Sequence, residues 1–357
     1  MEKIHPEGKI DIHNSENRYQ YSLNNLSKDK EIIPANKKII LEFIRDCRLG
    51  KTIKKGAKKK IEYKRCMKYI YGLRNLSSWL NKPFQKVALK DIENFVERLE
   101  DNKILSTKKK PYADESKSDL KKTLRKFYNW MGKPHLVDWL DTTTKRKDYE
   151  ALRKEDVTKL VNRVPSVRDK CLIMFLFDSG ARIEEALNVR LKHLEWKDKL
   201  GCYMLRIEFS KTKQRTISIP LCNEYIKDWL KEHHTPKNKE AQLFPMSYSN
   251  ILKILARATK KVFGKTYSPH SLRHSSATYY ANLLKNSFKL DYRYGWVIGS
   301  EMSRRYIDRT GINEEETVDV VKADENQQLR KEIEVMRNDI TFLKEVLYKA
   351  EAQMLKS

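Results

Sequence analysis

Apolar side chains recur with a helical period between residues 36 and 135. Within each set they are spaced so that they fall on one face of a helix. The sets are Ile39, Ile40, Phe43 and Ile44; Tyr69, Leu73, Leu76 and Leu80; Ile92, Phe95, Val96 and Leu99; and Leu120, Leu124, Phe127 and Trp130. The pattern predicts a bundle of about four helices over residues 36–135, with these stripes as its core.

The segments on either side of this bundle lack the pattern. Residues 1–35 are polar and rich in Asn, Ser and Lys, which indicates a flexible polar arm. Pro134 and the polar stretch at 141–148 interrupt the helical signal, so residues 136–148 are predicted to form a linker.

Residues 149–312 mix helical and strand patterns. Helices are expected near 153–163, 169–179, 224–232, 248–263 and 271–285. Two strands, near 203–209 and 216–219, flank the polar turn at 210–214 and predict a β-hairpin. The expected fold class is therefore mainly α, with an α+β second domain that contains a small β-hairpin or sheet.

A different periodicity fills residues 313–357, where apolar positions alternate in steps of four and three. They are Leu329, Ile333, Met336, Ile340, Leu343, Leu347, Ala350 and Met354. No Gly or Pro follows Gly311, so the stripe predicts a C-terminal coiled coil that joins protomers. A terminal helix packed on its own domain is the alternative.

Charge adds a partner to this picture. The chain has 357 residues and a net charge of +26, and residues 36–148 alone carry 31 basic and 14 acidic side chains. Such a surface attracts polyanions, so we expect double-stranded DNA as the partner. Within 51–65, eight of fifteen residues are basic, although a charge run can also be a merely solvated face. The candidate DNA contacts are Lys54, Lys55, Lys58, Lys59, Lys60, Lys64 and Arg65.

Composition also excludes some classes of protein. The longest apolar run, seven residues at 171–177, is too short to cross a bilayer, and the first residues do not form a signal peptide. The five cysteines are odd in number and include no C-x-x-C pair, which disfavours a disulfide scaffold or a zinc ribbon. We therefore expect a cytoplasmic protein with reduced thiols and no membrane partner.

Four short stretches of the second domain carry candidate chemistry. They are GARIEEAL at 180–187, SKTKQRT at 210–216, SPHSLRHSSA at 268–277 and GWVIGSEMSRRYIDR at 295–309. In this order they resemble the catalytic domain of the tyrosine recombinases (phage-integrase family), and the ending is similar to archaeal or mobile-element integrases. The resemblance implies a helical core-binding domain at 36–135 and a catalytic domain at 149–312.

The resemblance assigns roles to the first two stretches. Arg182, together with Arg273 from the third, implies a pair of guanidinium groups that hold a backbone phosphate. Glu185 matches a carboxylate that holds other active-site residues in place and does not itself contact the phosphate. Lys211 matches the general acid that protonates the leaving 5′ oxygen, and Lys213, on the same side of the hairpin, is the rival candidate.

The last two stretches supply the remaining candidates. His270 is expected to hydrogen-bond the phosphate and exchange a proton with the nucleophile, and Tyr306 matches that nucleophile. Trp296 matches a position that donates to phosphate or buttresses the tyrosine, although it lies ten residues before Tyr306, one more than usual in the family. His270 and His274 have the spacing of zinc ligands, but Ser271 stands where a zinc protease has Glu and no third ligand is evident.

Together these residues imply a site-specific DNA recombinase or integrase. It would cut through a 3′-phosphotyrosyl intermediate and rejoin strands through a Holliday junction within a tetramer, without metal, ATP or another cofactor. The alternatives are a type IB topoisomerase, which shares the chemistry, and a catalytically silent DNA-binding or architectural protein. Whether Tyr306 serves its own protomer or a neighbour is left open.

Overall fold

The computed structural model describes residues 9–52, 59–144, 150–210, 213–310, 329, 332–337 and 340–341. The chain divides into two compact units, Met1–Tyr149 and Glu150–Ser357, each with buried apolar side chains of its own. In the ranges described, no helix combines the length and apolar character that a membrane span requires.

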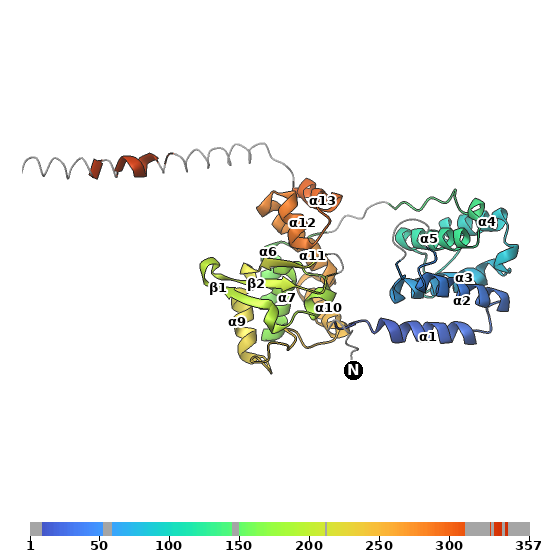
Figure 1. Ribbon diagram of the computed structural model, residues 1–357, viewed down its shortest axis with the longest axis horizontal. Coiled ribbons are helices and arrows are strands. Elements are labelled where there is room, and N and C mark those ends of the chain that lie inside the picture. The colour runs from blue at the N-terminus through green and yellow to red at the C-terminus, as the bar shows by residue number, and fades with distance from the viewer. Residues whose placement is uncertain are drawn as a thin grey trace, which may run out of the picture. The chain divides into compact units, whose positions relative to one another are not determined.

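The first unit is helical (Figure 1). Its helices are α1 (Ser15–Lys28), α2 (Pro34–Arg48), α3 (Tyr63–Leu80), α4 (Leu89–Glu100) and α5 (Asp114–Trp130). The four predicted helices are confirmed as α2 to α5, and their apolar stripes form one core. At its centre Phe43 and Phe127 pack edge to face, with ring centroids 5.3 Å apart.

Two segments beside the bundle differ from expectation. Part of the predicted flexible arm is the helix α1, which packs on α3 and buries Tyr19 and Leu26. These few apolar residues lie on one helix face, and the polar residues between them hid the pattern. The predicted linker is also shorter at its start, because Leu136, Val137 and Leu140 are buried in the core of the first unit.

The second unit contains eight α-helices and a small sheet within the described ranges. The helices are α6 (Lys154–Asn162), α7 (Val167–Ser179), α8 (Ile183–Leu187), α9 (Asn223–Glu232), α10 (Tyr248–Phe263), α11 (Pro269–Leu284), α12 (Ser287–Tyr294) and α13 (Glu301–Thr310). The five helices expected in this region are thus confirmed as α6, α7, α9, α10 and α11.

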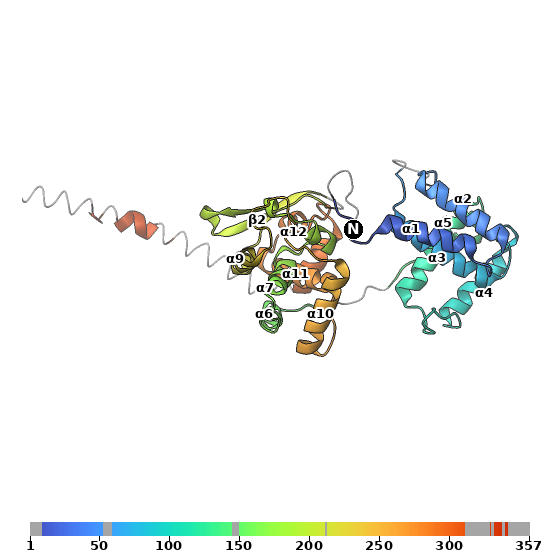
Figure 2. The same cartoon turned by 90° about the horizontal axis from the view of Figure 1, so that it is seen from below.

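Helix α7 forms the centre of this unit. Every residue from Cys171 to Ser179 is buried, since α6, α9 and α11 all pack against it. Both views show α7 beside α11 (Figures 1 and 2). Because residues 171–177 of α7 are apolar on all sides of the helix, the helix fixes the position of the chain that leaves its end at Gly180.

The sheet is antiparallel, with strand order β1-β2-β3. The predicted hairpin is confirmed as β2 (Cys202–Ile207) and β3 (Arg215–Ser218), with Ile207 opposite Arg215. The first strand, β1 (Leu194–Lys197), was not predicted, because it is only four residues long and three of them are exposed.

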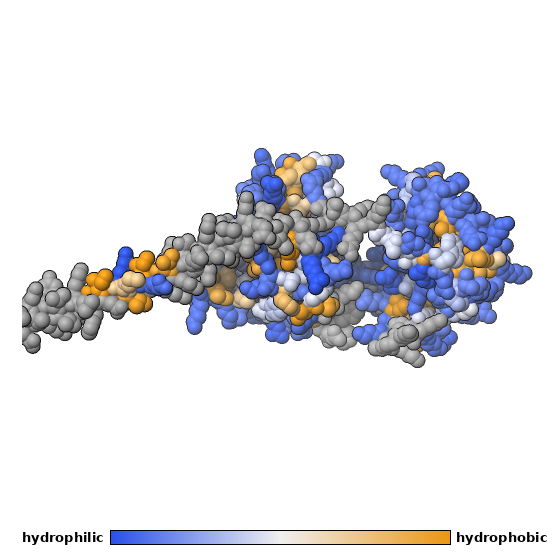
Figure 3. All heavy atoms as spheres, turned by 90° about the horizontal axis from the view of Figure 1, so that it is seen from above, coloured by the Kyte–Doolittle hydropathy of each residue, from blue (hydrophilic) through white to orange (hydrophobic). Residues whose placement is uncertain are grey.

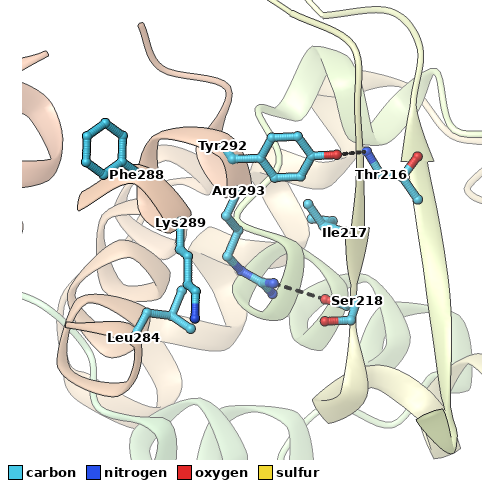
Figure 4. Close-up of a pocket in the computed structure, with 8 residues that line it drawn as sticks. All are labelled: Thr216, Ile217, Ser218, Leu284, Phe288, Lys289, Tyr292 and Arg293. Carbon is cyan, nitrogen blue, oxygen red and sulfur yellow. Dashed lines mark hydrogen bonds between the residues drawn. The ribbon is translucent and has the colours of Figure 1, made fainter. Parts of the chain in front are cut away.

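A shallow pocket lies between β3 and α12 (Figure 4). Across it the backbone N–H of Thr216 donates to the Tyr292 hydroxyl at 3.4 Å, and Arg293 donates to the Ser218 carbonyl at 3.1 Å. These bonds tie the edge of the sheet to α12. The face of the molecule seen in Figure 3 is mostly hydrophilic, in agreement with the charge of the sequence.

The predicted coiled coil falls largely outside the described residues, which exclude Leu343, Leu347, Ala350 and Met354. The four described members of the stripe are helical and exposed. They are Leu329, Ile333, Met336 and Ile340.

Candidate active site

The chain turns sharply between α7 and α8, and this turn presents Arg182. Gly180 ends α7 with a φ of 56°, in the left-handed region that glycine tolerates. Arg182 then caps α8, where its backbone N–H and its guanidinium donate to the Glu185 carboxylate at 2.9 and 3.0 Å. The Arg182 side chain is 30% exposed, so its guanidinium is oriented by Glu185 and still accessible from solvent.

Glu185 is buried and has a second arginine partner, Arg215 of β3. The Arg215 guanidinium lies 2.9 Å from the carboxylate, and both side chains are 1% exposed. Ser210 donates to the same carboxylate at 2.7 Å. Burial alone would raise the pKa of Glu185, but Arg215 and the hydrogen bonds from Arg182 and Ser210 lower that pKa to about 2. Glu185 is therefore a carboxylate at neutral pH.

The third arginine, Arg273, extends from α11 and is buried. Its guanidinium donates to the Gly180 carbonyl and, at 2.8 Å, to the Tyr294 carbonyl. Arg215 donates in the same way to the Arg293 carbonyl at 2.8 Å. These two carbonyls end α12, where a helix carries partial negative charge. One helix end thus holds two buried cations.

Positive charge exceeds negative charge in this cluster. Burial, followed by repulsion from Arg182, lowers the pKa of Arg273 to about 10. His270 is solvent-exposed, yet partial desolvation, followed by repulsion from Arg273 and Arg182, lowers its pKa as well, so it is uncharged at neutral pH. The cluster holds three guanidinium groups and one carboxylate, which pairs with Arg182 and Arg215. An anion such as a phosphodiester would balance the remaining positive charge.

Tyr306 lies beside this cluster, on α13. Helix α13 packs against α11 and α12 (Figure 1). The Tyr306 side chain is buried and stacks on Trp296, with ring centroids 5.3 Å apart and an interplanar angle of 3°. Trp296 stacks in turn on Tyr294 at 4.8 Å, and the Arg273 guanidinium lies 5.3 Å from the centroid of Tyr294. The longer spacing before Tyr306 therefore leaves Trp296 in contact with it.

The structure brings together most of the predicted site residues. Arg182, Glu185 and Arg273 surround the end of α7, and Trp296 contacts Tyr306. Lys211 lies outside the described residues, and its rival Lys213 is exposed.

Four of the predicted DNA contacts lie at or just before the start of α3, in the first unit. They are Lys59, Lys60, Lys64 and Arg65, and all four are exposed. Lys54, Lys55 and Lys58 lie outside the described residues.

Sequence reasoning missed two residues at this site. Arg215 follows the hairpin turn, and the signal in the sequence was that it shares the strand alternation of the apolar residues Ile217 and Ile219. In the sequence, His274 stands out only through its zinc-ligand spacing from His270, whereas in the structure its Nδ1 forms a hydrogen bond with the Tyr306 hydroxyl. Across the ranges that the structure describes, no three His, Cys, Asp or Glu side chains gather as a metal site would require.

Comparison with known proteins yields similar sequences. The model of the phage integrase family matches residues 150–311. Tyrosine recombinase XerA of Saccharolobus solfataricus is 26% identical over 217 residues, which cover 59% of this chain and 70% of the relative. Transposase A from transposon Tn554 of Staphylococcus aureus is 25% identical over 156 residues, 39% of this chain and 43% of the relative.

Solved structures show the same fold. The XerH site-specific recombinase bound to difH substrate is similar with a TM-score of 0.54 and 16% identity, over 84% of this chain and 93% of that one. A lambda integrase dimer bound to a COC′ core site has a TM-score of 0.55 and 16% identity, over 77% and 78% of the two chains. The mainly helical chain with its three-stranded sheet thus has a fold similar to that of these two structures.

Proposed function

Because this chain belongs to the phage integrase family and is a tyrosine-type site-specific recombinase that breaks and rejoins DNA, we propose that Tyr306 is its nucleophile. We assign Arg182 and Arg273 to the phosphate that Tyr306 attacks. The observation that carries this assignment is the surplus of guanidinium groups around Glu185, beside the helix that bears Tyr306. Positive charge held in place before the reaction stabilises charge that develops on the phosphate oxygens.

The reaction then follows from these groups. The Tyr306 hydroxyl gives up its proton to a neighbouring base as its oxygen bonds to phosphorus and the bond to the 5′ oxygen breaks, which leaves a 3′-phosphotyrosyl link and a free 5′ hydroxyl. Lys211 protonates the leaving oxygen, with Lys213 as the rival general acid. His270, uncharged at neutral pH, donates a hydrogen bond to the phosphate. Because the covalent link conserves the energy of the broken bond, rejoining needs neither ATP nor a metal ion.

Replacing Tyr306 by phenylalanine tests the nucleophile. A DNA substrate nicked near its crossover site traps the covalent complex. The short fragment that carries the free 5′ hydroxyl diffuses away, so the strand cannot be rejoined. We expect Tyr306→Phe to give no covalent complex and to bind DNA as the unmodified protein does. Denaturing gel electrophoresis measures the first quantity and a gel-shift titration the second.

The matched control is Tyr292→Phe, which removes the hydroxyl of an exposed tyrosine on α12. It should form the covalent complex at the unmodified rate. Continued trapping by Tyr306→Phe would assign the nucleophile to another residue and overturn the proposal.

We assign the first unit to DNA contact as the core-binding domain, because its exposed lysines lie around the start of α3. Lys54, Lys55, Lys58, Lys59, Lys60, Lys64 and Arg65 would contact phosphates there. This domain, expected at 36–135, also includes α1 and the buried residues up to Leu140. We propose the catalytic domain at 149–312. The buried free thiols of all five cysteines support a reducing cytoplasmic setting.

We assign the tail, residues 313–357, to self-association as a coiled coil, and the DNA-bound assembly to a tetramer. The exposed members of the stripe support this role, since Leu329, Ile333, Met336 and Ile340 are about half exposed in a single chain. Removal of residues 327–357 should therefore lower the solution mass while DNA affinity is retained. Light scattering measures the mass, and an unchanged mass would contradict the assignment.

A further inference from the structure

The hydroxyl of Tyr306 is already paired in the absence of DNA. It forms a hydrogen bond with Nδ1 of His274, and the two side chains are buried at 2% and 8% exposure. Their ring centroids are 5.9 Å apart, with an interplanar angle of 33°. A buried imidazole nitrogen therefore contacts the oxygen that the proposed reaction activates.

The surrounding rings hold this pair in place. Trp296 lies parallel to the Tyr306 ring, so the tyrosine cannot tilt away without breaking the stack. The second ring of the pair, His274, is contacted edge-on by His270, with ring centroids 4.4 Å apart and an interplanar angle of 77°. The Tyr306 hydroxyl is thus directed at His274, one helical turn beyond His270 on α11.

The order of residues along α11 connects this pair to the phosphate site. His274 directly follows Arg273, whose guanidinium is fixed by the Gly180 and Tyr294 carbonyls. The Arg273 guanidinium also lies 5.9 Å from the centroid of Trp296. One helix therefore carries both the proposed phosphate ligand and the residue that contacts the nucleophile.

We propose that His274 is a catalytic residue that accepts the proton of Tyr306 as the hydroxyl attacks phosphorus. This inference rests on the proposed role of Tyr306. The O–P bond forms, the bond from phosphorus to the 5′ oxygen breaks, the tyrosine proton moves to Nδ1 of His274, and the general acid protonates the 5′ oxygen. In rejoining, each proton returns. The expectation that His270 exchanges this proton is replaced, and His270 keeps its hydrogen bond to phosphate.

The variant His274→Asn tests proton transfer separately from orientation. The amide oxygen can still accept a hydrogen bond from Tyr306, but it cannot take up the proton. We expect the rate of covalent complex formation on saturating nicked DNA to fall by about 10²-fold or more, the usual contribution of a general base. DNA affinity should not change. A rate equal to that of the unmodified protein would overturn the proposal.

A second substrate identifies the proton that is affected. A sulfur atom in place of the bridging 5′ oxygen leaves without protonation, so it compensates for loss of a general acid and not for loss of a base. We expect His274→Asn to stay slow on this substrate. Recovery of the unmodified rate would place His274 on the leaving-group side and overturn the proposal.

The matched control is His233→Asn, which removes another buried histidine, one that lies 2.9 Å from the Gln242 carbonyl. Its cleavage rate should be unmodified. If thermal unfolding shows that His274→Asn does not fold, His274→Gln carries the same amide on a longer side chain and is judged by the same two rates. If Tyr306 is not the nucleophile, covalent trapping persists in Tyr306→Phe, and this result is independent of the rates of His274→Asn.

Discussion

Replacing Arg215 by methionine is expected to destabilise the folded protein by about 3–5 kcal/mol, the usual cost of removing one partner from a buried ion pair. The variant leaves the Glu185 carboxylate buried without its main charged partner. It also removes the hydrogen bond from Arg215 to the Arg293 carbonyl. Urea unfolding of the whole chain measures the change as a lower midpoint.

A nearby surface arginine provides the control. Arg206 lies on β2 with a side chain that is 62% exposed and pairs with Glu208 at 3.1 Å. Because exposed pairs contribute little, Arg206→Met should change the free energy of unfolding by about 0.5 kcal/mol or less. Equal losses in the two variants would contradict the importance of the buried pair.

The Arg215 deficit should also depend on pH. In the unmodified protein the pKa of Glu185 is lowered to about 2, so its ion pair stabilises the fold above the ordinary pKa near 4.5 and is lost as pH falls toward 2. In Arg215→Met the effect of burial is no longer offset by Arg215, so the pKa of Glu185 rises. Acid then protonates the buried Glu185 carboxylate. The free energy of unfolding that Arg215→Met loses relative to the unmodified protein should therefore shrink as pH falls from neutrality.

Replacing Gly180 by alanine is expected to damage both stability and cleavage. The added methyl carbon would lie 2.2 Å from a ring carbon of Tyr294 and 2.8 Å from the Ser276 hydroxyl, and the φ of 56° disfavours alanine. Such conformations cost about 1–2 kcal/mol, and overpacking adds about 1–3 kcal/mol. Movement of Gly180 or Tyr294 would also displace the carbonyls that hold Arg273. Thermal unfolding and the covalent-trapping rate measure the two effects.

Gly264→Ala separates the two causes. Gly264 follows α10 with a φ of 70°, and a methyl carbon there meets no atom within 4 Å. This control should show the backbone cost alone and cleave DNA at the unmodified rate. If the two glycine variants lost the same stability and cleaved equally well, the contact between Gly180 and Tyr294 would have no role in the site.

The parts of the fold that could be predicted are those with a strong local pattern. Helices α2 to α5 each bury one apolar face, and the hairpin of β2 and β3 is marked by a polar turn between apolar runs. Helix α1 escaped prediction because few apolar residues mark its buried face, and β1 because it is mostly exposed. Their positions depend on packing against distant segments, which no local window contains.

The candidate site divides in the same way. The sequence predicts a role for Arg182 and Arg273, and also for His270, Trp296 and Tyr306, because the four stretches occur in a recognisable order. The roles of Arg215 and His274 could not, because their partners lie 30 and 32 residues away along the chain. Only the folded chain shows which buried donor meets which acceptor.

The end of α12 gives two buried guanidinium groups a common reference point, since its last two carbonyls accept from Arg215 and Arg273. The distance between the two guanidinium groups is therefore set by the geometry of helix α12 and does not depend on the loops around that helix. During divergence, solvent-facing segments are free to adapt to a new target sequence while the chemical centre keeps its dimensions.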